Sequence, residues 1–206
     1  GHTVRMDLDG IRAAVERASA LTVKLLAFAR AQITELQGLD VLEVVMQIKP
    51  LLLRTLSEDM RLLLRLDPRS HLIRVDVVQL EQLLINLVVN ARDALTGARG
   101  EIVITTESRR IRMERKAIGG ERIPPGEYVV LSVIDNGEGI LPENLERIFD
   151  PFFTTKEVGE GTGLGLYTCL QLVRAAGGRI TVENRGEGGA NTWLWLPAAR
   201  GQLEAE

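Results

Sequence analysis

The chain has 206 residues, a formal net charge of −3, and 45 % hydrophobic against 26 % charged residues. This composition supports a buried core in one large domain, or in one domain with an appendage, and excludes wholesale disorder. The near-neutral charge argues against a nucleic-acid partner, and one cysteine with two histidines excludes an internal disulfide and a zinc site. No apolar run approaches the roughly 18 residues of a membrane helix. We therefore expect a soluble, cytoplasmic chain without membrane contact.

The first 38 residues are predicted to form one long helix. Gly1 and His2 look like the remnant of an expression tag and are left out of the fold reasoning. Gly38 is a helix-stop signal. Such a helix needs a partner helix or a second copy of itself, because it cannot bury its apolar seam alone. The seam follows a 3-4 spacing of apolar or small residues: Leu8, Ile11, Val15, Ala18, Thr22, Leu25 and Ala29.

Beyond residue 38, helical and strand patterns alternate. Helical spacing predicts three helices, at Leu42–Thr55, Asp76–Leu95 and Leu166–Ala176. Apolar, β-branched runs predict strands at Arg61–Asp67, Leu72–Val75, Glu101–Ser108, Tyr128–Asp135, Arg179–Glu183 and Ala190–Leu196. Arg109–Gly126 is charged and is predicted to be a long exposed hairpin arm, and Leu141-Pro142 resembles a helix start. The fold class is α+β, an α/β sandwich: a mixed, mainly antiparallel sheet with helices on one face, preceded by the long helix.

The predicted helix Asp76–Leu95 carries a polar stripe beside its apolar one. A solvated helix face is the ordinary interpretation, but this stripe uses short amides, which are mediocre helix formers. Side-chain carbonyls spaced four residues apart suit a hard cation such as Mg²⁺, which keeps water and phosphate oxygens as further ligands. The stripe consists of Gln79, Gln82, Asn86, Asn90 and Asp93.

Two glycine-containing segments follow. Asp135-Asn136-Gly137-Glu138-Gly139 ends a predicted strand, so it is either a plain turn or a carboxylate at the rim of the sheet beside a ligand. Gly159–Gly165 leads into a predicted helix, where backbone N–H groups can bind a phosphate, although a flexible linker is the alternative. Between them, Ile148–Lys156 holds three of the four phenylalanines, and indicates a hydrophobic plug for a mobile loop with Lys156 able to reach a terminal phosphate.

These four segments, in this order, resemble the ATP-binding catalytic domain of bacterial two-component sensor histidine kinases, in the gyrase/Hsp90/histidine kinase/MutL superfamily. The resemblance extends over residues 39–197 and implies the Bergerat-type ATP-binding fold for residues 39–206. The matching segments are the N box (Asn86–Leu95), the G1 box (Asp135–Gly139), the F box (Ile148–Lys156) and the G2 box (Gly161–Leu166).

Residues 1–38 resemble the second helix of the dimerisation and phosphoacceptor hairpin of the same family, with the first helix missing. The amino-acid sequences of the boxes most resemble those of hybrid-type kinases. The resemblance implies a homodimer through this helix in the full-length protein and a response regulator receiver domain as a partner, in the same chain or in another. Membrane anchoring of the full-length protein is left open.

The resemblance also implies ATP and Mg²⁺ as cofactors and assigns roles within the boxes. Asp135 would accept the adenine amino proton, Asn90 would ligate Mg²⁺ with help from Asn86, and Lys156 would hold the γ-phosphate. Asn86, Asn90 and Lys156 are thus the predicted catalytic residues. The predicted ATP-binding residues are Asn86, Asn90, Asp93, Asp135, Gly137, Gly139, Lys156, Gly161, Thr162, Gly163, Leu164 and Gly165.

The phosphoacceptor histidine of the family has no counterpart in this chain. His2 resembles tag sequence, and His71 lies between short predicted strands in no matching motif. We therefore expect a catalytic fragment that transfers the γ-phosphate of Mg-ATP to a histidine elsewhere, for relay to a response regulator, and that cannot autophosphorylate alone. One alternative is a non-catalytic nucleotide-binding scaffold that docks a receiver domain. The other, an ATPase clamp, is disfavoured because Asn86 stands where gyrase-type relatives have a glutamate that activates water.

Overall fold

The computed structural model describes residues 36–68, 72–95, 100–116, 122–156 and 161–199. The chain divides into two compact units, Gly1–Thr34 and Glu35–Glu206, and all described residues belong to the second. The predicted N-terminal helix, His2 and His71 lie outside the described residues. The assignment of residues 1–38 to a dimerisation hairpin therefore stays a prediction.

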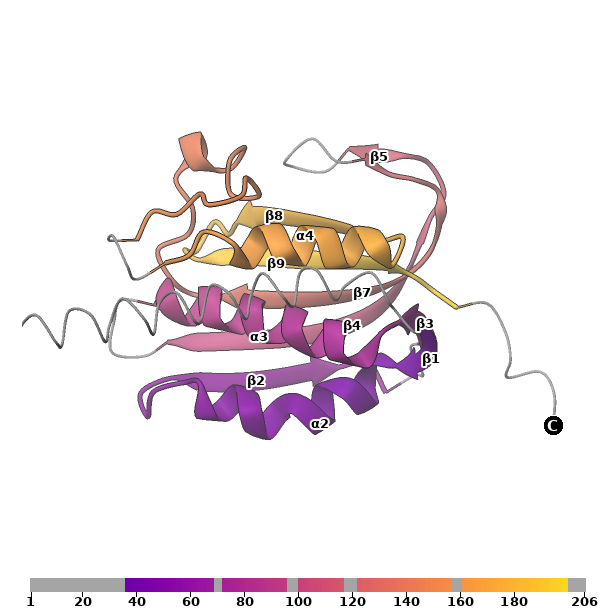
Figure 1. Cartoon of the computed structure of the whole chain (residues 1–206), viewed down its shortest axis with the longest axis horizontal. Coiled ribbons are helices and arrows are strands. Elements are labelled where there is room, and N and C mark those ends of the chain that lie inside the picture. Colours follow the sequence, from indigo (N-terminus) through magenta and orange to yellow (C-terminus); the bar gives the residue numbers. More distant parts are fainter. Residues whose placement is uncertain (1–35, 69–71, 96–99, 117–121, 157–160, 200–206) are drawn as a thin grey trace, which may run out of the picture. The chain divides into compact units, whose positions relative to one another are not determined.

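A five-stranded mixed sheet forms one layer of the second unit (Figure 1). Its order is β2-β4-β7-β9-β8, with β2 parallel to β4 and every other neighbouring pair antiparallel. A separate two-stranded sheet pairs β1 with β3. The bounds are β1 Gln37–Asp40, β2 Arg61–Leu66, β3 Leu72–Val75, β4 Glu101–Ile111, β7 Gly126–Asp135, β8 Arg179–Asn184 and β9 Ala190–Pro197.

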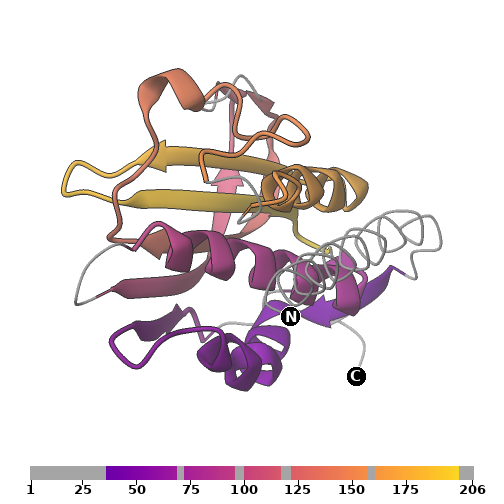
Figure 2. The same ribbon diagram turned by 60° about the vertical axis from the view of Figure 1, so that its left-hand side comes forward.

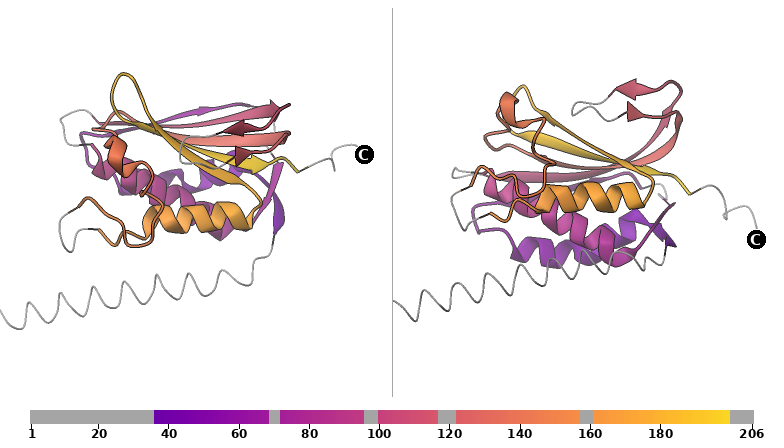
Figure 3. Two further views of the ribbon diagram at one scale, coloured as in Figure 1. Left: turned by 90° about the horizontal axis from the view of Figure 1, so that it is seen from above. Right: turned by 45° about the horizontal axis from the view of Figure 1, so that its top comes forward.

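Three helices cover one face of this sheet, as the view from above shows (Figure 3). They are α2 (Val41–Arg54), α3 (Val77–Asp93) and α4 (Gly165–Ala175). The first two begin at aspartate caps: Asp40 accepts a hydrogen bond from the Leu42 backbone N–H over 2.9 Å, and Asp76 accepts one from Gln79 over 3.1 Å. The arrangement confirms the predicted α+β sandwich with helices on one face.

The main core lies between the helices and the sheet. Strand alternation sends one side of β7 into it, so Val129, Leu131 and Val133 pack against the apolar stripe of α3, including Leu84 and Val88. Leu84, Val88 and Leu131 are fully buried. This apolar stripe fixes α3 between α2 and α4 (Figure 2), so the polar stripe beside it is held in a constant orientation.

The arm between β4 and β7 is only partly as predicted. The two strands stay in register out to the pair Ile111 and Gly126, and a short pair, β5 (Arg115–Lys116) with β6 (Arg122–Ile123), extends the arm. The expectation that the arm is exposed is wrong for Ile123, which is 1 % exposed and packs with Tyr128, Val130 and Trp195 on the sheet face away from the helices. That face carries apolar side chains without a helix layer, so the arm covers part of it.

Two other local predictions are corrected. Leu141-Pro142 starts only the single 3₁₀ turn η1 (Pro142–Asn144), in which Leu141 provides no side-chain cap. Gln37–Asp40 forms strand β1 against β3, where a helix end and a loop were expected. Within the described part of the chain, no helix is long and apolar enough to cross a membrane.

Candidate nucleotide-binding site

The four boxes converge on the polar side of α3. A β-carbon built on Gly165, the first residue of α4, would lie 3.6 Å from both amide atoms of Asn90. A β-carbon on Gly137 would lie 2.3 Å from the carbonyl oxygen of Ala94, the C-cap of α3. Lys156 of the F box forms an ion pair with Asp93, the last residue of α3. Segments far apart in the sequence thus meet around one helix.

Asp135 ends β7 and is the buried carboxylate of this site, with 7 % of its surface exposed. Its Oδ1 accepts hydrogen bonds from the backbone N–H groups of Gly137 over 2.9 Å and Ala190 over 3.2 Å. Burial raises the pKa of this carboxyl above its ordinary value, although the two N–H donors and the charge of Arg185 act in the opposite direction. One oxygen is therefore fixed by the protein, and Oδ2 remains as an acceptor for a ligand.

The G1 loop that follows Asp135 is held by close backbone contacts. The Glu138 N–H donates to the carbonyl of Ala94 over 3.1 Å, which joins the loop to the end of α3. Gly139 adopts φ +75°, and a β-carbon there would lie 2.9 Å from the side-chain oxygen of Asn184. Asn184 also accepts from the Ile140 N–H over 2.7 Å and donates to its carbonyl over 2.5 Å. Of the two alternatives for this segment, the plain turn is thus disfavoured, because the loop is docked at both ends.

Asn86 and Asn90 lie one turn apart on α3 and have different surroundings. Gln82 donates to the side-chain oxygen of Asn86 over 3.0 Å. The amide nitrogen of Asn90 is buried and has no hydrogen-bond partner among the described residues. An unpaired buried amide costs free energy, so this group is available for a ligand. Asn86 also contacts Cys169 of α4. Burial raises the pKa of the Cys169 thiol to about 12, although its hydrogen bond with Asn86 acts in the opposite direction.

The donor groups fit a magnesium ion that binds together with a phosphate ligand. Among the described residues, no group of three or more His, Cys, Asp or Glu could hold a metal ion. Mg²⁺ is commonly held by one or two protein oxygens and takes its other ligands from water and substrate phosphates. Asn90 would supply such an oxygen, and its buried amide nitrogen, which has no hydrogen-bond partner among the described residues, would donate to a phosphate oxygen. The Asn86 oxygen already accepts from Gln82.

The F and G2 boxes are joined by a close backbone contact between Phe152 and Gly163. The Phe152 N–H donates to the Gly163 carbonyl over 2.9 Å. Gly163 has φ +62°, and a β-carbon there would lie 2.2 Å from the carbonyl carbon of Phe152. Phe152 itself has φ +68° and is 67 % exposed. We call the Phe152–Gly163 contact the lid clasp, and it requires glycine at position 163.

The hydrophobic plug predicted for the F box consists of two phenylalanines, not three. Phe149 and Phe153 pack against a small cluster of Ile148, Val182 and Ala190. The guanidinium of Arg147 also lies 4.6 Å from the ring centroid of Phe153. Phe152 is directed away from this cluster by its positive φ and remains exposed.

The G2 box ends at the N-terminus of α4. Its N-cap, Leu164, provides no side-chain hydrogen bond to the first turn of the helix. A helix N-terminus without a side-chain cap, preceded by glycines, attracts an anion through its N–H groups and the helix dipole. Asn90 lies against this terminus, so a phosphate bound there would be next to the unpaired amide.

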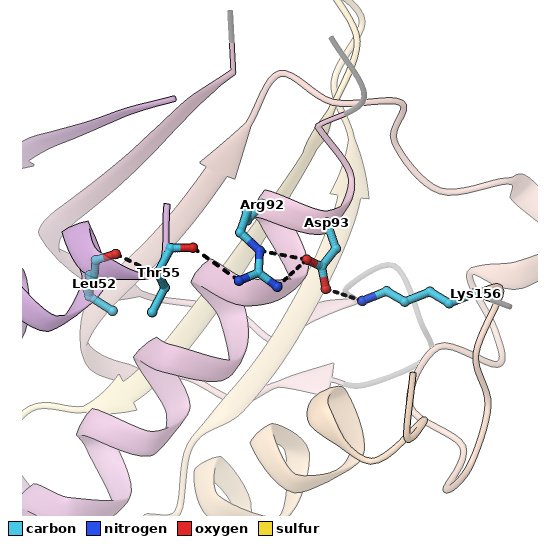
Figure 4. A network of polar contacts seen from close by, with 5 residues as sticks. All are labelled: Leu52, Thr55, Arg92, Asp93 and Lys156. Atoms are coloured by element: carbon cyan, nitrogen blue, oxygen red, sulfur yellow. Dashed lines mark hydrogen bonds and ion pairs between the residues drawn. The ribbon is translucent and has the colours of Figure 1, made fainter. Parts of the chain in front are cut away.

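Lys156 and Asp93 belong to a polar chain that crosses three elements (Figure 4). Arg92 contacts Asp93 Oδ1 at 2.5 Å and also donates to the carbonyl of Thr55, the C-cap of α2, over 3.1 Å. Lys156 takes the other oxygen, Oδ2. The predicted γ-phosphate ligand is therefore held beside α3 in the structure.

Three supporting residues were missed by the sequence reasoning. Asn184 holds the G1 loop, Arg185 donates to the Asp135 carbonyl over 3.0 Å, and the Ala190 N–H donates to its carboxylate. All three lie in or next to the β8–β9 hairpin. Gly188-Gly189 is a hairpin signal. At Gly189 (φ +84°) a β-carbon would lie 2.1 Å from the Asp135 carbonyl oxygen, but the sequence does not reveal that approach.

Comparisons with a family model and with curated relatives agree on the family of this chain. Residues 75–200 match the family described as histidine kinase-, DNA gyrase B-, and HSP90-like ATPase. Sensor kinase CckA of Brucella abortus is 37 % identical over 193 residues, which are 93 % of this chain and 20 % of CckA. Two-component sensor PprA of Pseudomonas aeruginosa is 53 % identical over 116 residues, 56 % of this chain and 12 % of PprA. The chain thus spans a fifth or less of the length of these relatives.

A solved structure extends the similarity to three dimensions. Full-length ShkA in complex with AMPPNP superimposes with a TM-score of 0.69 and 27 % identity, over 88 % of this chain and 36 % of that one.

Proposed function

Because the chain belongs to the family of histidine kinase-, DNA gyrase B- and HSP90-like ATPases, we propose that it is the catalytic part of a sensor histidine kinase. It binds Mg-ATP and transfers the γ-phosphate to a histidine outside these 206 residues. The observation that carries the proposal is the convergence of the Asp135 carboxylate, the unpaired Asn90 amide and the N-terminus of α4 on one side of α3.

Asp135 selects the base in this proposal. Its Oδ1 is held by two backbone N–H groups, so Oδ2 accepts from the exocyclic amino group of adenine. Guanine presents a carbonyl at the equivalent position, and two acceptors facing each other in a buried site are strongly unfavourable. The site therefore discriminates between bases by one hydrogen bond.

The phosphates lie between α3 and the start of α4. The N–H groups of residues Gly161–Gly165 bind the terminal phosphate, with Lys156 as the cationic side chain. Asn90 would hold Mg²⁺, with Asn86 assisting through water or phosphate, and the bound ion would supply positive charge to neutralise the phosphate oxygens. Neither amide can act as a general base, which favours transfer to a histidine over hydrolysis.

The acceptor and the partners follow from the relatives rather than from the described residues. CckA is named a sensor kinase and PprA a two-component sensor. We assign the present chain to the same type of pathway, with a response regulator receiver domain as the final acceptor and residues 1–38 as a dimerisation helix. The reaction then takes place in the cytoplasm, where ATP and the response regulator are found.

A transfer assay tests this proposal. The chain is incubated with Mg²⁺, γ-labelled ATP and a separate dimerisation hairpin of a sensor histidine kinase, chosen because it carries a phosphoacceptor histidine. We expect acid-labile label on the hairpin, no stable label on the chain alone, and loss of transfer in Asn90→Ala. Nucleotide binding without transfer would favour the scaffold alternative, and steady phosphate release without labelled hairpin would favour an ATPase.

A further inference from the structure

Asp93 was expected from the sequence to be one of the ATP ligands. Its carboxylate lies at the C-terminal end of α3 and contacts two cations, Arg92 and Lys156. Each oxygen has its own partner: Oδ1 accepts from Arg92 Nε over 2.8 Å, and Oδ2 accepts from Lys156 Nζ. Both oxygens are therefore engaged by the protein, in contrast to Asp135, which keeps one oxygen for a ligand.

The Arg92 side chain, which contacts Asp93, is itself anchored to α2. Arg92 also donates to the carbonyl of Thr55 over 3.1 Å, and the Thr55 hydroxyl donates to the Leu52 carbonyl over 2.7 Å at the end of α2. The carboxylate of Asp93 is thus supported by two helices that share the main core (Figure 4). It forms a fixed point for a side chain arriving from the F box.

Lys156 reaches this point along the glycine-rich segment. A β-carbon on Gly161 would lie 3.2 Å from Lys156 Cδ and 2.5 Å from the Thr154 hydroxyl, so the lysine stem passes beside the first glycine of the G2 box. The Lys156 N–H also donates to the Thr154 hydroxyl over 3.2 Å. An ammonium group has three hydrogens, and Asp93 uses one. The others remain for an oxygen ligand between α3 and the G2 box.

The charges at this place leave a surplus for an anion. Arg92 and Lys156 contribute two positive charges against one negative charge on Asp93. Although partial burial opposes ionisation, the hydrogen bonds from Lys156 and Arg92 hold the pKa of Asp93 below its ordinary value. The carboxylate is ionised at neutral pH, and the three groups together remain cationic.

We propose that Asp93 is a positioning residue for the terminal phosphate of ATP, which acts through Lys156 by holding its ammonium beside the glycine-rich segment before the nucleotide binds. The inference rests on the proposed function and adds a residue role to it. Since ADP lacks the terminal phosphate, the Asp93–Lys156 pair should matter for ATP and not for ADP. A purely structural role for Asp93 would affect both nucleotides alike.

Calorimetry with Mg²⁺ and either AMPPNP or ADP tests this difference. Asp93→Asn should weaken AMPPNP binding about fivefold and leave ADP binding within about twofold, a size typical of one partly exposed ion pair. Asp93→Glu should restore part of the loss. Lys156→Met removes the same contact without altering α3 and should also spare ADP. In the Lys156→Met background, Asp93→Asn should have no further effect, and Asp59→Asn, on an exposed turn, serves as the control.

The outcomes separate this inference from the proposed function. Equal losses for ADP and AMPPNP in Asp93→Asn, unchanged AMPPNP affinity, or full additivity with Lys156→Met would each overturn the positioning role while the unaltered chain still binds ADP. Absence of ADP binding by the unaltered chain would instead contradict the proposed function, and the positioning role with it.

Discussion

At the scale of single residues, the two aspartates of the site differ in what they leave free. Asp135 gives one oxygen to the backbone of Gly137 and Ala190, whereas Asp93 gives both oxygens to cations. In the roles that we propose, the same type of side chain therefore recognises a base in one place and orients a lysine in the other. Burial and the number of protein donors, rather than residue type, decide between the two roles.

Asp135→Asn should separate base recognition from folding. The asparagine keeps an oxygen for the N–H groups of Gly137 and Ala190, but it turns the free acceptor Oδ2 into a donor that repels the adenine amino group. We expect ATP affinity to fall at least about tenfold, since a buried donor is left unpaired. Calorimetry measures the loss, with Asp59→Asn as the control.

The same substitution should alter stability with a defined pH dependence. Because the folded-state pKa of Asp135 is raised, its ionisation opposes folding, and this cost is absent below the ordinary aspartate pKa. The cost grows as pH rises from that value through the raised pKa, and is constant above it. Denaturant unfolding should therefore show Asp135→Asn more stable than the unaltered chain at neutral pH, with the difference vanishing in acid. An equal difference at both pH values would contradict the raised pKa.

The sequence singled out candidate site residues but not the residues that support them in the structure. Asn86, Asn90, Asp135 and Lys156 stand out because amides within a helix and a carboxylate at the end of a strand violate local preference. Asn184 ends β8 and Arg185 follows it, just before a glycine-rich turn, where polar residues are ordinary. Their contacts with the G1 box depend on the pairing of β9 with both β7 and β8, which no local pattern encodes.

At the scale of elements, the lid clasp determines how the F and G2 boxes meet. Phe152 carries two costs there, a positive φ and an exposed ring. The hydrogen bond from its backbone N–H to the Gly163 carbonyl joins the F box to the G2 box next to the N-terminus of α4. The glycine-rich segment of the sequence therefore needs glycine at 163 for close approach, in addition to any contact with phosphate.

Gly163→Ala should open the lid clasp. The added β-carbon meets the Phe152 carbonyl carbon and adopts φ +62°, which costs an L-residue about 1–2 kcal/mol before the clash is counted. We expect affinity for AMPPNP to fall roughly tenfold, because unclasped conformations compete with the one that binds. Gly186→Ala is the matched control, since a β-carbon there meets nothing within 4 Å. Equal affinity for both variants would show that the clasp is not needed.

Most elements follow from periodicity, and the exceptions have physical reasons. The helices α2, α3 and α4 and the five strands of the main sheet were predicted because each has one apolar face against the shared core. The extension of β4 to Ile111 was not predicted, because charged residues such as Arg109 and Arg110 are typical of an exposed loop. In the structure, pairing with β7 keeps them in the strand. Strand β1 depends on its partner β3, and the 3₁₀ turn at Pro142 lacks a cap.

At the scale of the whole molecule, the packed core and the candidate nucleotide site occupy different parts of the sandwich. The apolar stripes of the helices and one face of the sheet form a continuous core, while the polar side of α3 and the glycine-rich loops stay at its edge. The family match covers residues 75–200, which include all four boxes. The chain therefore contains the elements of a nucleotide site together with the scaffold that orients them.

Calorimetric titration of the unaltered chain with ATP and with GTP, each with Mg²⁺, tests this nucleotide site most directly. We predict that ATP binds at least about tenfold more tightly than GTP, because Asp135 accepts a hydrogen bond only from adenine. The preference should disappear in Asp135→Ala. The absence of binding heat with ATP, or equal affinity for the two nucleotides, would contradict the assignment of this site to adenine nucleotide.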